Sequence, residues 1–185
     1  MRETTQHRTR SVDLANSRAP AISSDRNRVL VIEDWLLAAA SDVQQARREW
    51  DEGALTLLRC GDLFTAIRLP GDSVRVAASS IDPAEVSAYL AKVFDGGPVI
   101  ASRSRYYALV PPSTGVAWQH PDAECLTWGT WLGVPPVTST TCEDSPAHWA
   151  VPMSRPGKLC DADAVAQLVQ LAQQLLSGQE AGDGS

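Results

Sequence analysis

The stretch GDLFTAIRLP, residues 61–70, has the pattern of a buried strand between two turns. A Gly-Asp pair precedes its apolar residues and a Pro-Gly-Asp sequence follows them, and both are typical of tight turns. A second apolar run, residues 54–60, ends directly before Gly61, so the two runs are predicted to pair as a β-hairpin. The apolar residues of the stretch are Leu63, Phe64, Ala66, Ile67 and Leu69.

Length and composition favour one domain with a tail at each end. The chain has 185 residues, of which 44% are hydrophobic, enough to form a sizeable core. Residues 1–28 hold six Arg and three acidic residues and show no apolar periodicity, so they are predicted to be a disordered, Arg-rich tail. Residues 29–178 are predicted to form the domain, and residues 179–185 a disordered acidic tail.

The charge and cysteine content exclude several classes of protein. The net charge is −6, which disfavours strong non-specific DNA binding because that depends on basic side chains. No apolar run reaches 18 residues and the N-terminus lacks the apolar core of a signal peptide, so we expect a cytoplasmic protein without a membrane partner. The four cysteines form no CxxC pair, and we expect neither a metal site nor a cofactor.

Periodicity elsewhere predicts a mixture of helices and short strands. Residues 34–50 and 161–176 have an apolar stripe with helical spacing. A third helix is predicted to start at the capping residue Asp82 and to end at Gly96. Such an order favours an α+β domain whose helices cover one face of a mostly antiparallel sheet. Further strands are predicted over residues 74–79, 98–102, 105–111, 116–118, 124–128, 130–136 and 148–152.

Four segments within residues 48–152 carry a family resemblance. They read, in order, WDEGALTLLRC, GDLFTAIRLPGD, ASRSRYYALVP and DAECLTWGTWLGVPP. Together they resemble the N-terminal prim-pol domain of bifunctional DNA primase/polymerases. The similarity is stronger to small proteins of actinobacterial genomes and integrative elements that carry a reduced form of this domain. The resemblance implies a prim-pol-like core, which is related to the RRM fold.

The resemblance also implies where the family's catalytic positions fall. Its chemistry needs two metal-binding aspartates two residues apart on one strand, and here these positions hold Thr65 and Ile67. The position of a nucleotide-contacting histidine holds Tyr106, and that of a third carboxylate holds Glu124. Hard divalent cations prefer carboxylate oxygens, so loss of the aspartate pair predicts loss of catalysis. We therefore expect no catalytic residue.

The resulting expectation is a non-catalytic regulatory or accessory factor, an activator. It would serve DNA replication or maintenance of an actinobacterial plasmid or integrative element, with a replication protein or DNA as its partner. One alternative is nucleic-acid binding, because arginines interleaved with aromatic residues can hold single strands. The same aromatic residues could equally form a protein–protein surface, and they are Tyr106, Tyr107, Trp128 and Trp131. Another is weak nucleotidyl transfer that uses Glu124. The sequence leaves the oligomeric state open. The residues expected for nucleic-acid binding are Arg68, Arg103, Arg105, Tyr106 and Trp131.

A short cluster of polar residues, His120, Asp122 and Glu124, is a separate candidate site. Three such groups within five residues could bind a metal or exchange protons. The same composition is also typical of a solvated loop in which His120 precedes the turn at Pro121. We favour the loop interpretation.

Overall fold

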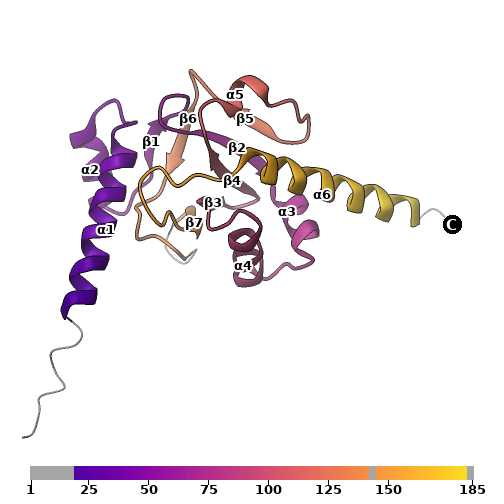
Figure 1. Ribbon diagram of the computed structural model, residues 1–185, viewed down its shortest axis with the longest axis horizontal. Coiled ribbons are helices and arrows are strands. Elements are labelled where there is room, and N and C mark those ends of the chain that lie inside the picture. Colours follow the sequence, from indigo (N-terminus) through magenta and orange to yellow (C-terminus); the bar gives the residue numbers. More distant parts are fainter. Residues whose placement is uncertain (1–18, 142–144, 183–185) are drawn as a thin grey trace, which may run out of the picture.

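The computed structural model describes residues 19–141 and 145–182 (Figure 1). Its mixture of helices and antiparallel strands confirms the predicted α+β class. The helices are α1 (Ala19–Leu37), α2 (Val43–Asp51), α3 (Gly71–Ala78), α4 (Pro83–Val93), α5 (Thr114–Ala117) and α6 (Ala162–Gly182). The strands are β1 (Thr56–Arg59), β2 (Thr65–Pro70), β3 (Val99–Ser102), β4 (Arg105–Val110), β5 (Glu124–Leu126), β6 (Trp131–Val134) and β7 (Ala147–Val151).

The strands form two sheets, and all their pairings are antiparallel. A five-stranded sheet has the order β5-β2-β4-β3-β7, and β1 pairs only with β6 in a two-stranded sheet. The predicted hairpin between residues 54–60 and 63–69 is therefore wrong. The Gly61 N–H donates to the Phe64 carbonyl over 2.8 Å, and this turn leads the chain from one sheet into the other. Partner choice depends on distant residues, which local turn chemistry does not reveal.

Both faces of the five-stranded sheet are covered (Figure 1). Because side chains alternate along a strand, β2 contributes to two cores. Ile67 and Leu69 face a core formed with α3, α4 and α6, whereas Ala66 faces a core formed with α1, α2, β1 and β6. The prediction that helices cover one face is thus corrected, since α1 and α2 lie on the other. The second core includes Ile32, Leu36, Trp50, Leu58, Phe64, Leu109 and Trp149.

Two of the predicted helices differ in extent. The segment over residues 34–50 is interrupted, because Asp42 accepts hydrogen bonds from the N–H groups of Gln44 and Gln45 and starts α2. The preceding helix, α1, already begins at Ala19, inside the segment that was expected to be disordered; residues 1–18 of that segment lie outside the described residues. Helix α6 continues to Gly182, past the predicted end and into the expected acidic tail.

The helix predicted from its cap at Asp82 is confirmed. Asp82 Oδ1 accepts hydrogen bonds from the N–H groups of Ala84 at 2.8 Å and Glu85 at 3.0 Å, and Pro83 occupies the first helical position. These contacts satisfy backbone donors that a helix N-terminus otherwise leaves unpaired. Local capping chemistry was therefore sufficient to place α4.

Two segments predicted as strands are helical. Residues 74–79 fall largely within α3, where Val74 and Ala77 are both buried at a spacing of three residues. Residues 116–118 overlap α5. Val and Ala tolerate either state, and in α3 burial of Val74 and Ala77 against α6 and the sheet overrides the weak strand preference. Among the described residues, no helix has both the length and the apolar composition needed to cross a membrane.

Candidate binding surface

The four positions aligned with the prim-pol catalytic residues do not meet in one site. Thr65 and Ile67 are fully buried on the face of β2 that α3 and α6 cover. Tyr106 lies on the same face, because it is paired with Leu69 in the β2–β4 register. Glu124 is paired with Arg68 and points to the opposite face, where the two side chains form an ion pair. The structure separates Glu124 from the other three positions by the thickness of the sheet.

The strand positions that would carry metal ligands are part of the core. Ile67 packs in the cluster with α3, α4 and α6, and Thr65 Oγ1 has no hydrogen-bond partner among the described residues. The described ranges 19–141 and 145–182 contain no group of three or more His, Cys, Asp or Glu side chains placed to hold a metal ion. Metal-dependent phosphoryl transfer at these positions would require carboxylates and access that the core does not provide.

The residues expected to bind nucleic acid are distributed over several parts of the molecule. Arg103 and Arg105 lie at the β3–β4 turn, beside the Pro70 end of β2. Arg68 is engaged with Glu124, and Tyr106 is buried beneath the helices. Trp131 belongs to the two-stranded sheet, which the chain reaches from the other end of β2. They do not form one continuous surface.

The His120 cluster has the character of a loop. The His120 ring lies against Trp118, with ring centres 4.6 Å apart. Asp122 accepts a hydrogen bond from the Gln173 side chain, and Glu124 is paired with Arg68. Because each of the three groups faces a different partner, they do not converge on a common ligand. The Trp118 indole N–H donates to the Ala123 carbonyl over 2.7 Å, which closes this loop.

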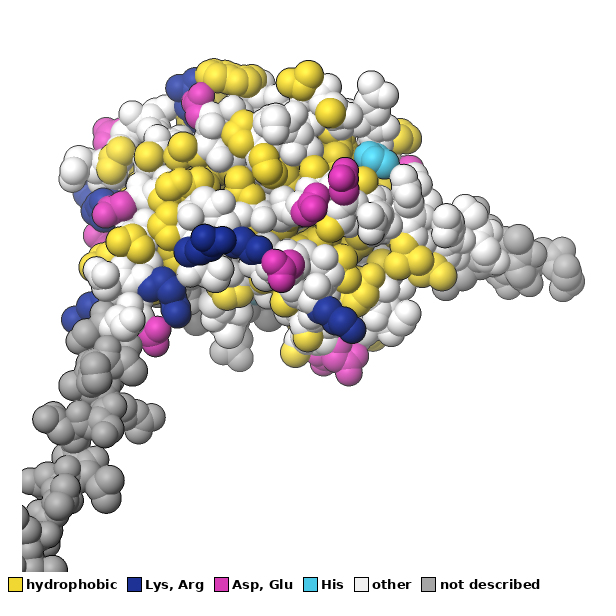
Figure 2. Space-filling view, viewed as in Figure 1, with side chains coloured by type: hydrophobic (Ala, Val, Ile, Leu, Met, Phe, Trp, Pro, Cys, Tyr) yellow, Lys and Arg dark blue, Asp and Glu magenta, His cyan; other side chains and the backbone are white. Residues whose placement is uncertain are grey.

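An exposed aromatic surface lies on the outer face of the two-stranded sheet. We call Leu57, Arg59, Trp128 and Trp131 the tryptophan surface. Side chains of β1 alternate, so Leu58 enters the core while Leu57 and Arg59 face outward. Leu57 is 61% exposed, Trp128 64% and Trp131 47%, large fractions for apolar side chains. Figure 2 shows hydrophobic side chains next to charged ones at the upper edge of the molecule, over the turn that precedes β6.

Cross-strand contacts hold these side chains together. Arg59 is directly opposite Trp131 in the β1–β6 register. The Arg59 guanidinium also lies 5.7 Å from the centre of the Trp128 ring, a cation–π geometry. The Trp128 ring packs on Gly61, whose backbone has φ +109°, and a Cβ there would approach Trp128 Cγ to 2.9 Å. The turn that begins at Gly61 therefore supports the exposed Trp128 side chain.

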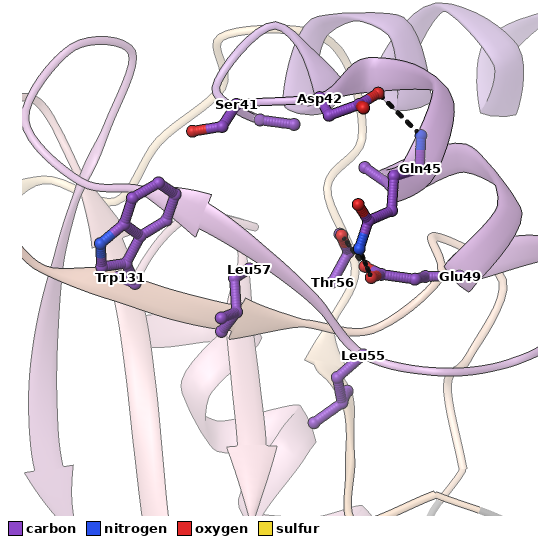
Figure 3. A pocket seen from close by; sticks show the side chains of 10 residues that line it. Ser41, Asp42, Gln45, Glu49, Leu55, Thr56, Leu57 and Trp131 are labelled. Carbon is purple, nitrogen blue, oxygen red and sulfur yellow. Dashed lines mark hydrogen bonds between the residues drawn. The ribbon is translucent and has the colours of Figure 1, made fainter.

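A groove of about 360 Å³ adjoins the tryptophan surface. Figure 3 shows Leu55, Leu57 and Trp131 on its strand side, and Asp42 and Glu49 on the side of α2. The Glu49 carboxylate accepts hydrogen bonds from Gln45 Nε2 at 2.9 Å and Thr56 Oγ1 at 2.5 Å. These bonds lower the pKa of Glu49, so it is ionised at neutral pH. The groove thus has one apolar and one acidic wall.

The strand edge beside this groove is open at Leu57. The Cys60 N–H donates to Thr130 across the sheet, whereas the Arg59 N–H donates outward to Ala39 at 3.0 Å. Because backbone groups alternate in direction along an antiparallel strand, the N–H and C=O of Leu57 point outward as well. Leu57 also lines the groove, next to Ala40 and Ser41. An extended chain in the groove could therefore hydrogen-bond to this edge.

No protein-family model, curated protein or solved structure matches this chain. The candidate binding surface is therefore identified from its geometry alone. Of the tryptophan surface, the sequence-based prediction named Trp128 and Trp131, as residues that could bind nucleic acid or a protein, and it did not name Leu57 or Arg59. Residues 56–59 read TLLR and have no alternation of apolar and polar residues, so the sequence does not indicate that Leu57 faces away from the core. Trp128 lies in a turn, where no periodic pattern predicts exposure.

Proposed function

We propose that this protein is a non-catalytic regulatory or accessory factor that binds a partner protein through the tryptophan surface and its adjoining groove. The observation that carries this proposal is the pair of exposed tryptophans beside Arg59 on an uncovered sheet face. Trp and Arg are the residues most enriched among those that dominate protein–protein binding energy. Contiguous exposed apolar side chains are also typical of interaction sites.

The groove specifies the chemistry of the partner segment. Its apolar wall of Leu55, Leu57 and Trp131 favours an apolar side chain, and Asp42 and Glu49 favour a lysine or arginine. The open edge at Leu57 favours an extended backbone, as in binding by strand addition. The proposed partner therefore offers an extended segment that combines apolar and basic residues.

The proposed biological context comes from the four quoted segments. Their resemblance to prim-pol domains supports a cytoplasmic role with a replication protein, in replication or maintenance of an actinobacterial plasmid or integrative element. Burial of Thr65 and Ile67 supports a role without catalysis, because metal ligands there would have no access to substrate. The same resemblance supports a role in a DNA-related process without requiring that the protein bind DNA itself.

A pair of matched variants tests the proposal. Trp128→Ala with Trp131→Ala removes the aromatic anchors, whereas Val116→Ala shortens another apolar side chain that is 92% exposed. Cross-linked complexes are recovered from cells with the wild type and both variants as bait, and the captured protein is purified for calorimetry. We expect the Trp double variant to weaken binding at least tenfold and Val116→Ala to leave the Kd unchanged. Equal binding by all three would contradict the proposal.

The alternatives predict different outcomes for the same proteins. Nucleic-acid binding would give a salt-dependent shift of labelled single-stranded DNA that is lost in Arg103→Gln and Arg105→Gln. Residual nucleotidyl transfer would give Mn²⁺-dependent dinucleotide synthesis that Glu124→Ala abolishes. Either result, together with an unaffected Trp double variant, would replace the protein-binding proposal.

A further inference from the structure

A second cavity, of about 340 Å³, lies on the helix-covered side of the five-stranded sheet. Its floor is formed by Ala101, Tyr106 and His148, which the register places side by side because Ala101 is paired with both other residues. Residues of helices α3 and α4 form its walls. The tryptophan surface belongs to the other side of the sheet, so this cavity is independent of the proposed protein-binding surface.

The polar side chains of the cavity are cationic or hydrogen-bond donors. Arg75 enters from α3 and Arg103 from the β3–β4 turn. No Asp or Glu is among the described residues that line the cavity, although the chain as a whole carries a net charge of −6. Arg75 Nη2 also forms an ion pair with Asp72 Oδ1 at 2.6 Å. Asp72 is exposed and is not among the residues that line the cavity. Two guanidinium groups in one cavity of an acidic protein indicate an anionic ligand.

The two neutral groups on the floor complement these charges. Burial raises the pKa of Tyr106, and the nearby positive charge of Arg75 only partly offsets this effect. The phenol therefore keeps its proton at neutral pH and can donate a hydrogen bond. Burial lowers the pKa of His148, so its imidazole is neutral and presents one donor. The cavity thus offers donors from α3, from the β3–β4 turn and from its floor.

The backbone at the mouth of the cavity is held in an unfavourable conformation. Arg103 has φ +47° in a two-residue turn between paired Ser102 and Arg105, at a position where glycine is preferred. The Gly71 N–H donates to Ser104 at 2.7 Å, which ties the turn to the start of α3. A Cβ on Gly71 would lie 2.6 Å from the Ser104 oxygen and 3.1 Å from Arg75 Nη1. The close approach of these elements brings the two arginines to one cavity.

We propose that this cavity binds a small phosphorylated molecule, with its phosphate between Arg75 and Arg103. Both guanidinium groups can form paired hydrogen bonds to phosphate oxygens, and Tyr106 can donate a further one. The remainder of the ligand would contact the apolar wall formed by Ile81, Pro83 and Ala150. The cavity volume of about 340 Å³ is within the range of small-molecule sites and is sufficient for a compact ligand.

Arg103→Gly is the decisive variant because it should not harm folding. Glycine adopts positive φ without strain, so the variant removes the guanidinium and is expected to leave the unfolding midpoint equal or higher. Arg105→Gln is the matched control, since Arg105 is exposed on the same hairpin but does not line the cavity. Binding of inorganic phosphate and of phenyl phosphate is measured by calorimetry, with sodium chloride as the ionic-strength control.

The expected result is saturable binding of phenyl phosphate, tighter than that of inorganic phosphate. Arg103→Gly and Arg75→Gln should each weaken it at least tenfold, and Arg105→Gln less than twofold. Absence of saturable binding would overturn the proposal, and so would an equal loss in Arg103→Gly and Arg105→Gln. A thymidine oligonucleotide that binds more tightly than phenyl phosphate, and that loses affinity in both variants, would assign the arginines to nucleic-acid binding instead.

Discussion

Arg68 and Glu124 form an ion pair across β2 and β5, on the face of the sheet opposite to Thr65 and Ile67. Their side chains are 36% and 51% exposed, so solvent screens the interaction. We expect Glu124→Gln to lower the free energy of unfolding by less than about 1 kcal/mol, as for other exposed pairs. Urea unfolding followed by circular dichroism measures this change. A loss several times larger would show that the pair has a structural role.

Thr65 offers a test in which removal of a hydroxyl stabilises the fold. Its Oγ1 is buried without a partner among the described residues, whereas Thr56, equally buried, donates to Glu49 at 2.5 Å. Burial of an unpaired hydroxyl is unfavourable, so Thr65→Val is expected to raise the free energy of unfolding by about 1 kcal/mol. Thr56→Val should not stabilise the fold in this way, because the Thr56 hydroxyl donates a hydrogen bond to Glu49 that the variant removes. Chemical denaturation of both variants provides the comparison.

Restoring aspartates at the aligned metal positions tests the prim-pol alignment. Thr65→Asp with Ile67→Asp would place two carboxylates in the core beneath α3 and α6. Each buried unpaired charge costs several kcal/mol, so the double variant is expected to be unfolded and to bind no Mn²⁺. Leu57→Asp, which is exposed on β1, should remain folded. A folded double variant with saturable Mn²⁺ binding would show that this strand can form the family's metal site.

Gly61 should be intolerant of a side chain. Its φ of +109° strains any other residue, and a Cβ would lie 2.9 Å from Trp128 Cγ. We expect Gly61→Ala to lower the free energy of unfolding by about 1–3 kcal/mol and to change the tryptophan fluorescence spectrum. The control is Gly178→Ala in α6, where a Cβ meets nothing within 4 Å. That substitution should be stabilising by about 0.5–1 kcal/mol, because alanine favours helix.

Two cysteines should differ in reactivity. Burial raises the pKa of the Cys160 thiol to about 12, and its Sγ donates to the Pro98 carbonyl. Cys125 is only half-buried, and burial raises the pKa of its thiol as well. Since the thiolate is the reactive form, iodoacetamide at pH 8 is expected to modify Cys125 at least tenfold faster. Peptide mass spectrometry measures both rates, and the difference should vanish in denaturant.

Elements governed by local chemistry were predictable. The Asp82–Pro83 start of α4, the stripe of α6 and the short β-branched or aromatic runs of β3 and β4 all follow from residues close together in sequence. The helix over residues 71–78 could not be predicted in this way, because Val and Ala fit either a strand or a helix. Contact with α6 and the sheet decided their state. For the tryptophan surface, the sequence indicated Trp128 and Trp131 as candidate binding residues. It did not indicate Leu57, because exposure of an apolar side chain depends on what covers it, which lies outside its own segment.

For GDLFTAIRLP, local residues were sufficient to predict a buried strand that follows a turn, because apolar content and turn residues act locally. The second predicted turn is wrong, since helix α3 begins at Gly71 directly after the strand. Tertiary structure decided the rest. In the folded protein, β2 pairs with β4 and β5 instead of β1. Ile67 is buried beneath helices, whereas Arg68 forms an ion pair with Glu124 on the other face of the sheet. Strand hydrogen bonds join residues far apart in the chain, and a strand's register and covering layers decide which side chains reach solvent. Only the folded arrangement therefore shows which residues are available for function.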